Sequence, residues 1–147
     1  MEPTVTCDAQ LENLAALLHH VDQTCRRFEV DPDTTAALRL AAEEVVVNII
    51  THGYAGRPAG PIALTCGTDA DTVWVVITDQ APPFDPTRLP PPNLDAAFDD
   101  RPIGGLGWHL VRETMDDVRY CVTPQGGNRV TLIKRRPPAP GSPLPGR

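Results

Sequence analysis

Proline is concentrated in two short segments of this chain, and this restricts where helices and strands can form. Six of the 17 prolines fall between residues 82 and 92, and five more fall from residue 137 onward. Because proline lacks a backbone N–H and fixes φ, segments so rich in it form neither helix interiors nor inner strands. Regular structure is therefore expected before residue 79 and between residues 104 and 135.

The length and the two proline-rich segments predict one folded domain with a lid and a tail. A chain of 147 residues can bury a core as a single domain, which we assign to residues 1–136. A loop as long as residues 80–103 in a compact domain is either functional or disordered, and we interpret it as a lid. Residues 137–147 contain five prolines and two glycines and are expected to form a flexible tail.

Charge and hydropathy argue against several classes of protein. The formal net charge is −6, and the first cluster of basic residues is the short run Lys134–Arg136, whereas nucleic-acid-binding domains usually carry a basic stripe. The N-terminus lacks the basic region followed by an apolar stretch that a secretory signal needs, and no apolar run is long enough for a membrane span. The sequence therefore predicts a cytoplasmic protein without nucleic-acid or membrane partners, which binds other proteins or a phosphate ligand that brings its own cation.

Four cysteines, at positions 7, 25, 66 and 121, form no Cys-x-x-Cys pair. Cys66 and Cys121 lie in apolar runs, where a free cysteine behaves as a small hydrophobic residue. We expect reduced structural thiols and no cysteine metal site.

Hydrophobic periodicity predicts three helices and five strands. Apolar residues recur with a helical period in residues 9–29, in residues 31–50 and from the glycines at 104–107 onward, and they alternate along five shorter runs: 3–7, 62–66, 73–77, 118–122 and 129–135. We predict an α+β fold, a two-layer α/β sandwich with a mixed, mostly antiparallel sheet and all helices on one face.

The second predicted helix is apolar nearly all round but carries one polar stripe. Glu44, Asn48 and His52 are spaced four residues apart, so their side chains share a face. A buried amide or carboxylate without a partner is costly, which favours a polar cavity or a ligand beside this stripe. The alternative is a helix edge exposed to solvent, and periodicity alone leaves both open.

Two further features have a functional and a purely structural interpretation. Asp79 ends a predicted strand and enters the proline-rich loop, where an aspartate can bind a ligand or simply form a turn. The glycines at 104–107 open a predicted helix, where bare N–H groups and the helix dipole suit a phosphate, but glycine also simply permits tight turns.

Taken together, the order and spacing of these features are much more specific than any one of them. The relevant stretches are Glu44-Val-Val-Val-Asn48, His52-Gly-Tyr54, Asp79-Gln-Ala-Pro-Pro-Phe-Asp-Pro86, Gly104-Gly-Leu-Gly107, Leu110-Val111-Arg112, Met115-Asp116-Asp117 with Tyr120, and Gly127-Asn-Arg-Val-Thr-Leu132. Across about residues 5–135 the chain resembles the GHKL (Bergerat-type) ATP-binding fold and, more narrowly, the anti-sigma-factor serine/threonine kinases of the RsbW type.

The resemblance implies a role for each matching residue. Asn48 matches the amide that holds Mg²⁺ on the ATP phosphates, and Glu44 matches the general base that takes the proton of a serine hydroxyl. Asp79 matches the acceptor for the adenine amine, and Thr131 matches a hydroxyl near the same edge of the base. The remaining nucleotide-binding candidates are the phosphate loop, an arginine for the γ-phosphate and the last residue of the polar stripe: Gly104, Gly105, Leu106, Gly107, Arg101 and His52.

The resemblance also implies partners: a sigma factor, an anti-sigma antagonist of the STAS type as the phosphorylated substrate, and a second copy of the chain in a homodimer. One departure concerns the loop after Asp79, where the family commonly has glycines at the positions of Ala81 and Pro83. If position 81 needs a positive φ, alanine costs about 1 kcal/mol there, and proline cannot adopt a positive φ. A non-catalytic nucleotide-binding protein that acts by sequestration therefore remains the alternative, ahead of a histidine-kinase catalytic domain.

Overall fold

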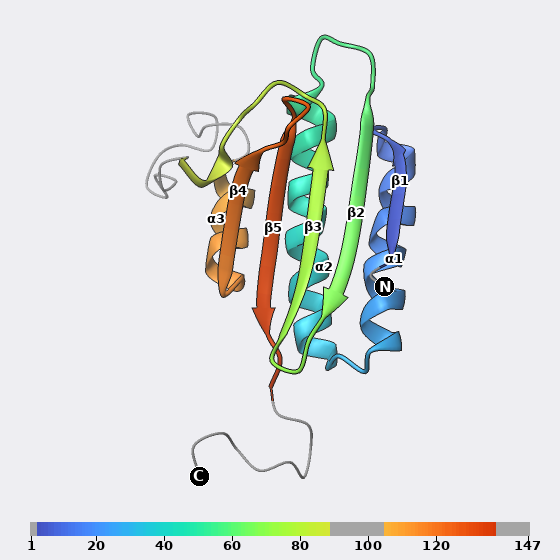
Figure 1. Cartoon of the computed structure of the whole chain (residues 1–147), viewed down its shortest axis with the longest axis vertical. Coiled ribbons are helices and arrows are strands. Elements are labelled where there is room, and N and C mark those ends of the chain that lie inside the picture. The colour runs from blue at the N-terminus through green and yellow to red at the C-terminus, as the bar shows by residue number, and fades with distance from the viewer. Residues whose placement is uncertain (1–2, 89–104, 138–147) are drawn as a thin grey trace.

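The computed structural model describes residues 3–88 and 105–137, which form a sheet with helices packed on one side (Figure 1). The five strands are β1 (Thr4–Asp8), β2 (Pro61–Thr68), β3 (Thr72–Asp79), β4 (Asp117–Val122) and β5 (Asn128–Arg135). Their order in the sheet is β1-β2-β3-β5-β4, and every neighbouring pair is antiparallel. The predicted two-layer α+β sandwich is confirmed, although the described sheet has no parallel pair and so is not mixed.

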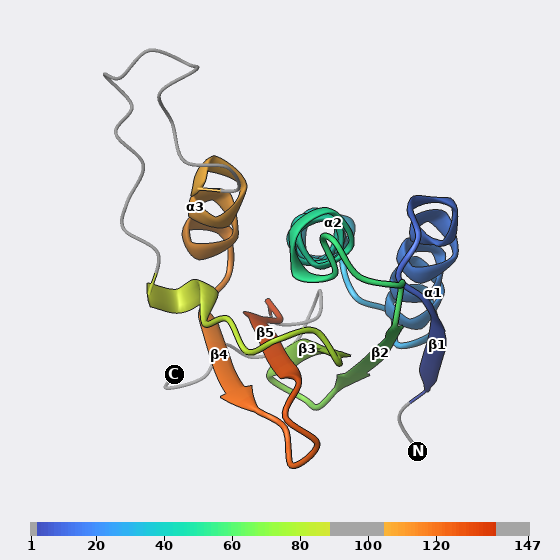
Figure 2. The same ribbon diagram turned by 90° about the horizontal axis from the view of Figure 1, so that it is seen from above.

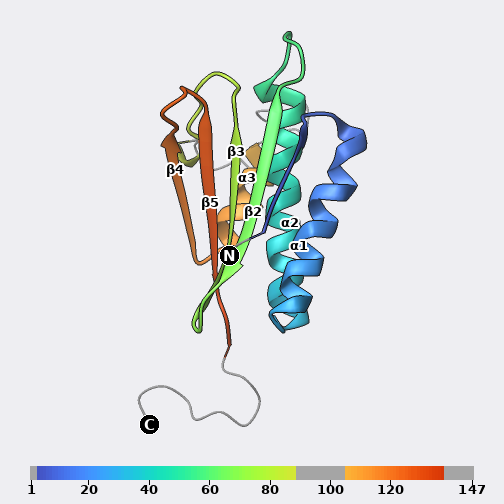
Figure 3. The ribbon, with the colours of Figure 1, turned by 45° about the vertical axis from the view of Figure 1, so that its right-hand side comes forward.

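Three helices cover the same face of this sheet, as the view from above shows (Figure 2). They are α1 (Leu14–Arg27), preceded by the 3₁₀ turn Leu11–Asn13, then α2 (Pro32–Asn48) and α3 (Gly105–Thr114). Helices α1 and α2 pack side by side (Figure 3), with α1 against β2 and α2 against β3 and β5. Helix α3 packs on the other side of α2 (Figure 2).

Local sequence explains where α2 begins and how it ends. The Asp31 carboxylate accepts a hydrogen bond from the Thr34 N–H at 3.0 Å, and Pro32 occupies the first turn, where no N–H is needed. At its C-terminal end the helix continues into the π-helical turn Ile49–Gly53. π-helical turns are rare in proteins, and many of those that occur lie at functional sites.

Alternating apolar residues of the inner strands form the core beneath the helices. The inward-facing side chains of β2 and β3 are almost completely buried: Ile62, Leu64, Cys66, Val73, Val75 and Ile77. They meet Leu17 and Val21 of α1 and Leu38 and Val46 of α2. Trp74 points to the opposite, helix-free face, where it lies over Gly67, and a Cβ at position 67 would overlap the indole ring.

The four cysteines are free thiols, and Cys25 and Cys66 lie buried in the core. Within residues 3–88 and 105–137, no three His, Cys, Asp or Glu side chains are grouped as a metal site would require. Over the same residues, no helix combines the length and apolarity that crossing a bilayer demands.

Several sequence predictions fall outside the described residues. They are most of the predicted lid, the tail beyond Pro137, Gly104 and the γ-phosphate candidate Arg101. The start of the lid is described as far as Arg88 and includes the 3₁₀ turn Pro86–Arg88. The glycine turn predicted at 104–107 belongs, from Gly105 on, to the first turn of α3 itself.

Candidate functional site

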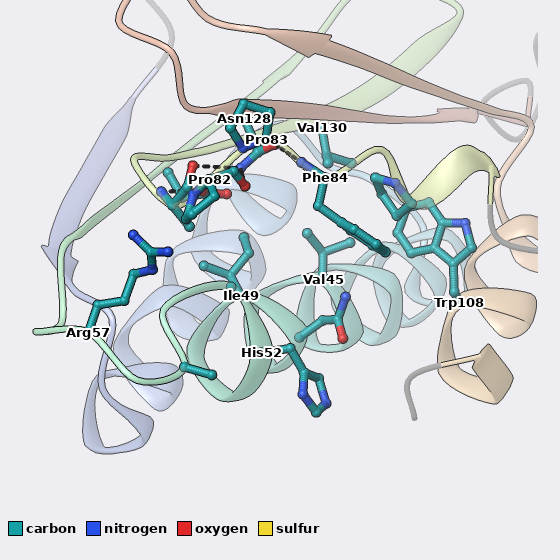
Figure 4. A pocket seen from close by; sticks show the side chains of 16 residues that line it. Val45, Ile49, His52, Arg57, Pro82, Pro83, Phe84, Trp108, Asn128 and Val130 are labelled. Carbon is teal, nitrogen blue, oxygen red and sulfur yellow. Dashed lines mark hydrogen bonds between the residues drawn. The ribbon is translucent and has the colours of Figure 1, made fainter. Parts of the chain in front are cut away.

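A cavity of about 480 Å³ opens between the C-terminal end of α2, the start of α3 and the strand ends where β3 finishes and β5 begins. Figure 4 shows its lining: Val45, Ile49 and His52 come from the α2 side, Asn128 and Val130 from β5, and Pro82, Pro83 and Phe84 from the loop that follows β3. Arg57 and Trp108 lie at opposite ends of this lining.

The polar stripe of α2 borders this cavity and a smaller one beside it. Asn48 and His52 line both, and Glu44 lines only the smaller hollow of about 210 Å³. Asn48 is half-buried, whereas His52 is exposed on the π-helical turn. The sequence left open whether the polar stripe faces a cavity or solvent, and the structure places it at the border of two cavities.

The Glu44 side chain contacts the first turn of α3. A Cβ at position 107 would overlap the Glu44 carboxylate, so only glycine allows this approach. The N-terminal end of a helix carries the positive end of the helix dipole. Because Glu44 contacts the first turn of α3, the candidate base lies beside this positive end. Gly105 and Leu106 belong to the same turn.

Asp79 lies at the other side of the cavity, at the end of β3, and is only 3 % exposed. Its Oδ1 accepts hydrogen bonds from the Ala81 N–H at 2.8 Å and from the Asn128 amide at 2.9 Å. Burial raises the pKa of this carboxyl group above its ordinary value, and the two hydrogen bonds oppose that rise. Oδ2 has no partner among the described residues, so it is available to a ligand in the cavity.

The loop after Asp79 accommodates its non-glycine residues without strain. Glu29 is the one non-glycine residue with positive φ in the described part of the chain, so Ala81 and Pro83 both have negative φ. Ala81 is buried, whereas Phe84 is 54 % exposed and forms part of the cavity wall. The departure from family glycines therefore introduces no positive-φ strain in this loop.

The structure does not bring Thr131 to the cavity. Neighbouring residues of a strand point to opposite faces, and Val130, next to Thr131, lines the cavity and is buried. Thr131 lies on the helix-free face, where it pairs with Val76 on one side and Arg119 on the other. Its predicted position near the adenine base is therefore wrong. The prediction overlooked that Asn128, Val130 and Leu132 alternate toward the helices, which leaves Thr131 on the opposite face.

Among the lining residues that sequence reasoning missed are Arg57, Phe84, Trp108 and Asn128. For Asn128 a sequence signal existed, since the alternation of β5 places it on the same face as the buried Val130 and Leu132. Arg57 belongs to the connection between α2 and β2, whose path no periodicity predicts. Trp108 lies in the predicted third helix and was not considered as a site residue, and the structure shows it buried and lining both cavities.

Comparison with known proteins identifies the fold and its relatives. Residues 7–134 match the family model described as a histidine kinase-like ATPase domain. The chain belongs to this family. Among solved structures, the RsbU and RsbW domains of a Mycobacterium tuberculosis protein share the fold, with a TM-score of 0.58 at 18 % identity, over 92 % of this chain and 34 % of that one.

Curated relatives of this family member carry the names expected from the sequence motifs. The serine/threonine-protein kinase BtrW of Bordetella bronchiseptica is 34 % identical over 102 residues, which cover 69 % of this chain and 70 % of the relative. The serine-protein kinase RsbW of Bacillus subtilis is 29 % identical over 130 residues, 86 % and 80 % of the two chains. The anti-sigma F factor of Clostridium novyi is 23 % identical over 122 residues, 83 % and 80 %. The resemblance to RsbW-type kinases is thus confirmed.

Proposed function

We propose that this chain is an ATP-dependent serine/threonine protein kinase that also acts as an anti-sigma factor. It would bind a sigma factor and phosphorylate an anti-sigma antagonist of the STAS type. The observation that carries the proposal is a single cavity to which α2 contributes Asn48 and the end of β3 contributes Asp79, with Glu44 in the adjoining hollow. The names of the relatives, serine-protein kinase and anti-sigma factor, support the same activity.

The cavity fits a nucleotide in size and in the chemistry of its polar groups. Ligand pockets of 300–1,000 Å³ are typical for small molecules, and about 480 Å³ lies within that range. Oδ2 of Asp79, which no described residue bonds, is an acceptor suited to the exocyclic amine of adenine. The Asn48 amide oxygen is the hard type of ligand that Mg²⁺ takes, since this ion usually binds few protein groups together with phosphate oxygens and water.

The glycines at the start of α3 support a phosphate role for that turn. Gly105, Leu106 and Gly107 lie in the first turn of the helix, where N–H groups lack helical partners and favour an anion. In the proposed site this turn would contact the phosphates, and His52 lines the hollow that α2 and Trp108 border. Gly104 and Arg101 lie outside the described residues.

In the proposed reaction, bound ATP supplies the γ-phosphoryl group. Glu44 would take the proton of the substrate serine hydroxyl, which requires hydrogen-bond reach between the two. Glu44 stands one helical turn before Asn48, so the base and the metal ligand face the same space. The hollow that Glu44 lines adjoins the nucleotide cavity through Asn48, His52 and Trp108, which border both. A serine hydroxyl that enters this hollow would lie next to the phosphates in the proposed site.

Phosphorylation of the antagonist would act as the switch between partners. A phosphoserine adds close to two negative charges at neutral pH. This charge would disfavour docking of the antagonist and leave the kinase free to hold the sigma factor. The alternative, sequestration without phosphoryl transfer, drew support from Ala81 and Pro83, and the negative φ of both removes the strain argument for it.

Transfer of labelled phosphate tests the proposal. The purified protein would be incubated with [γ-³²P]ATP, Mg²⁺ and a purified STAS-type antagonist, alongside the variants Glu44→Gln and Glu43→Gln. Glu43 is the matched control because it is the neighbouring carboxylate on α2 and lines neither cavity. We expect label on the antagonist with wild type and Glu43→Gln and none with Glu44→Gln. ATP binding without transfer by any of them would favour sequestration.

A further inference from the structure

The buried side chain of Asn128 connects three segments at the Asp79 side of the cavity. Its amide nitrogen donates to Asp79 Oδ1 at 2.9 Å and to the carbonyl oxygens of Ala81 and Pro82, each at 3.2 Å. Its amide oxygen accepts from the Phe84 N–H at 2.9 Å and from the Tyr120 hydroxyl. The residue is only 6 % exposed, and its hydrogen bonds to Asp79 and to the Ala81 carbonyl are buried.

The prolines of the loop explain why a side-chain amide is needed here. Pro82 and Pro83 have no backbone N–H, so the loop lacks two of the donors that could satisfy its own carbonyl groups. Asn128 supplies a donor to the carbonyls of Ala81 and Pro82 and an acceptor for the first N–H after the prolines, that of Phe84. An asparagine can do both at once because its amide has two donors and an acceptor oxygen.

The same hydrogen bonds determine which oxygen of Asp79 meets a ligand. Oδ1 is held by the Ala81 N–H and by the Asn128 amide, which fixes the orientation of the carboxylate. Given the proposed function, we infer that Asn128 is a positioning residue that presents Asp79 Oδ2 to the base and thereby sets the preference for a purine with an exocyclic amine. Asn128 acts through Asp79 and not by contacting the reacting phosphate.

Comparing two nucleotides separates this positioning role from a purely structural one. Calorimetry would give the dissociation constants of ATP and of purine riboside 5′-triphosphate, which lacks the amine, both with Mg²⁺. A hydrogen bond to a charged group makes wild type prefer ATP by about tenfold or more. In Asn128→Ala the carboxylate loses its fixed orientation, so we expect this ratio to fall to about one. Tyr120→Phe removes only the hydroxyl that holds the Asn128 oxygen, and it should lower the ratio by a smaller factor.

Thr123→Ala is the matched control. The Thr123 hydroxyl accepts from the Gly127 N–H at 3.0 Å in the same hairpin, and in the described part of the chain it makes no hydrogen bond with Asp79 or Asn128. This variant should lose stability while keeping the wild-type ratio. An unchanged ratio in both Asn128→Ala and Tyr120→Phe, with wild type still preferring ATP, would overturn the inference alone. Failure of wild type to bind either nucleotide would instead overturn the proposed function, and the inference with it.

Discussion

Asp79 combines a cost to folding with the proposed contact to the base. Its raised pKa means that the folded state binds the proton more tightly than the unfolded chain does. The free energy of unfolding therefore falls as pH rises from the ordinary value of 3.8 through the raised value, and the ionised carboxylate is a net cost at neutral pH.

We expect Asp79→Asn to separate stability from binding. The amide oxygen can still accept from Ala81 and Asn128, so the nucleotide-free variant should be at least as stable as wild type at pH 7. Its NH₂ group would then face the adenine amine, donor against donor, and ATP affinity should fall by about tenfold or more. Thermal unfolding with and without ATP measures both effects. A variant that is markedly less stable yet still binds ATP would contradict them.

Gly107 provides a second prediction at the residue scale. A Cβ there would overlap the end of the Glu44 side chain, which is flexible enough to move away. We expect Gly107→Ala to keep the melting temperature within a few degrees of wild type, about the change for 1 kcal/mol, while phosphoryl transfer is lost because the base is displaced. Circular dichroism and the labelling assay would measure the two. Full transfer activity in this variant would argue against Glu44 as the base.

At the scale of elements, the turn between β4 and β5 shows how two adjacent glycines serve different purposes. Gly126 has φ +86° and open space around its Cα, so only backbone conformation restricts it. Gly127 faces the backbone of Asp79 and Gln80, and a Cβ there would overlap the Asp79 carbonyl. Because neither partner at position 127 is a movable side chain, β3 and β5 would have to separate.

We therefore predict unequal costs for the two alanine substitutions. Gly126→Ala should lower the free energy of unfolding by about 1 kcal/mol, the cost of a positive φ. Gly127→Ala should lower it by about 2–3 kcal/mol or more, as overpacking against a rigid neighbour does, and should weaken ATP binding because the strand end that carries Asp79 shifts. Urea denaturation measures both. Equal losses would mean that the close approach of β5 to Asp79 is not required.

The elements themselves were largely predictable because periodicity is a local property. The predicted strands at 73–77 and 118–122 agree with β3 and β4 to within two residues, and the Asp31-Pro32 start of α2 is confirmed. The π-helical turn after Asn48 has no sequence signature of this kind. Gly105 and Gly107 belong to α3 itself, and Gly107 lies against the Glu44 side chain, a tertiary contact that sequence periodicity does not reveal.

At the scale of the whole molecule, the site residues that could be predicted were those that lie in short sequence motifs. Asn48 and Asp79 are far apart in sequence, and only the resemblance indicated that they share a cavity. Asn128 reaches Asp79 because the register between β3 and β5 pairs the two residues directly. Thr131 was misplaced for the same reason, since the face of a strand residue depends on that register. Sequence alone fixes neither the register nor the path of the loop that brings Arg57 to the cavity.

The predicted homodimer is a separate property of the whole molecule. Size-exclusion chromatography with light scattering should give twice the 15.9 kDa mass of one chain. A single-chain mass at micromolar concentration would exclude this part of the prediction and leave the nucleotide site untouched.

The central claim is that one cavity holds Mg²⁺ and ATP between α2 and the end of β3. A crystal structure with Mg²⁺ and a non-hydrolysable ATP analogue tests it most directly. We predict the adenine amine within hydrogen-bond distance of Asp79 Oδ2, the metal ion on the Asn48 amide oxygen and the phosphates beside the first turn of α3. A nucleotide bound elsewhere, or an empty cavity at saturating analogue, would contradict the claim.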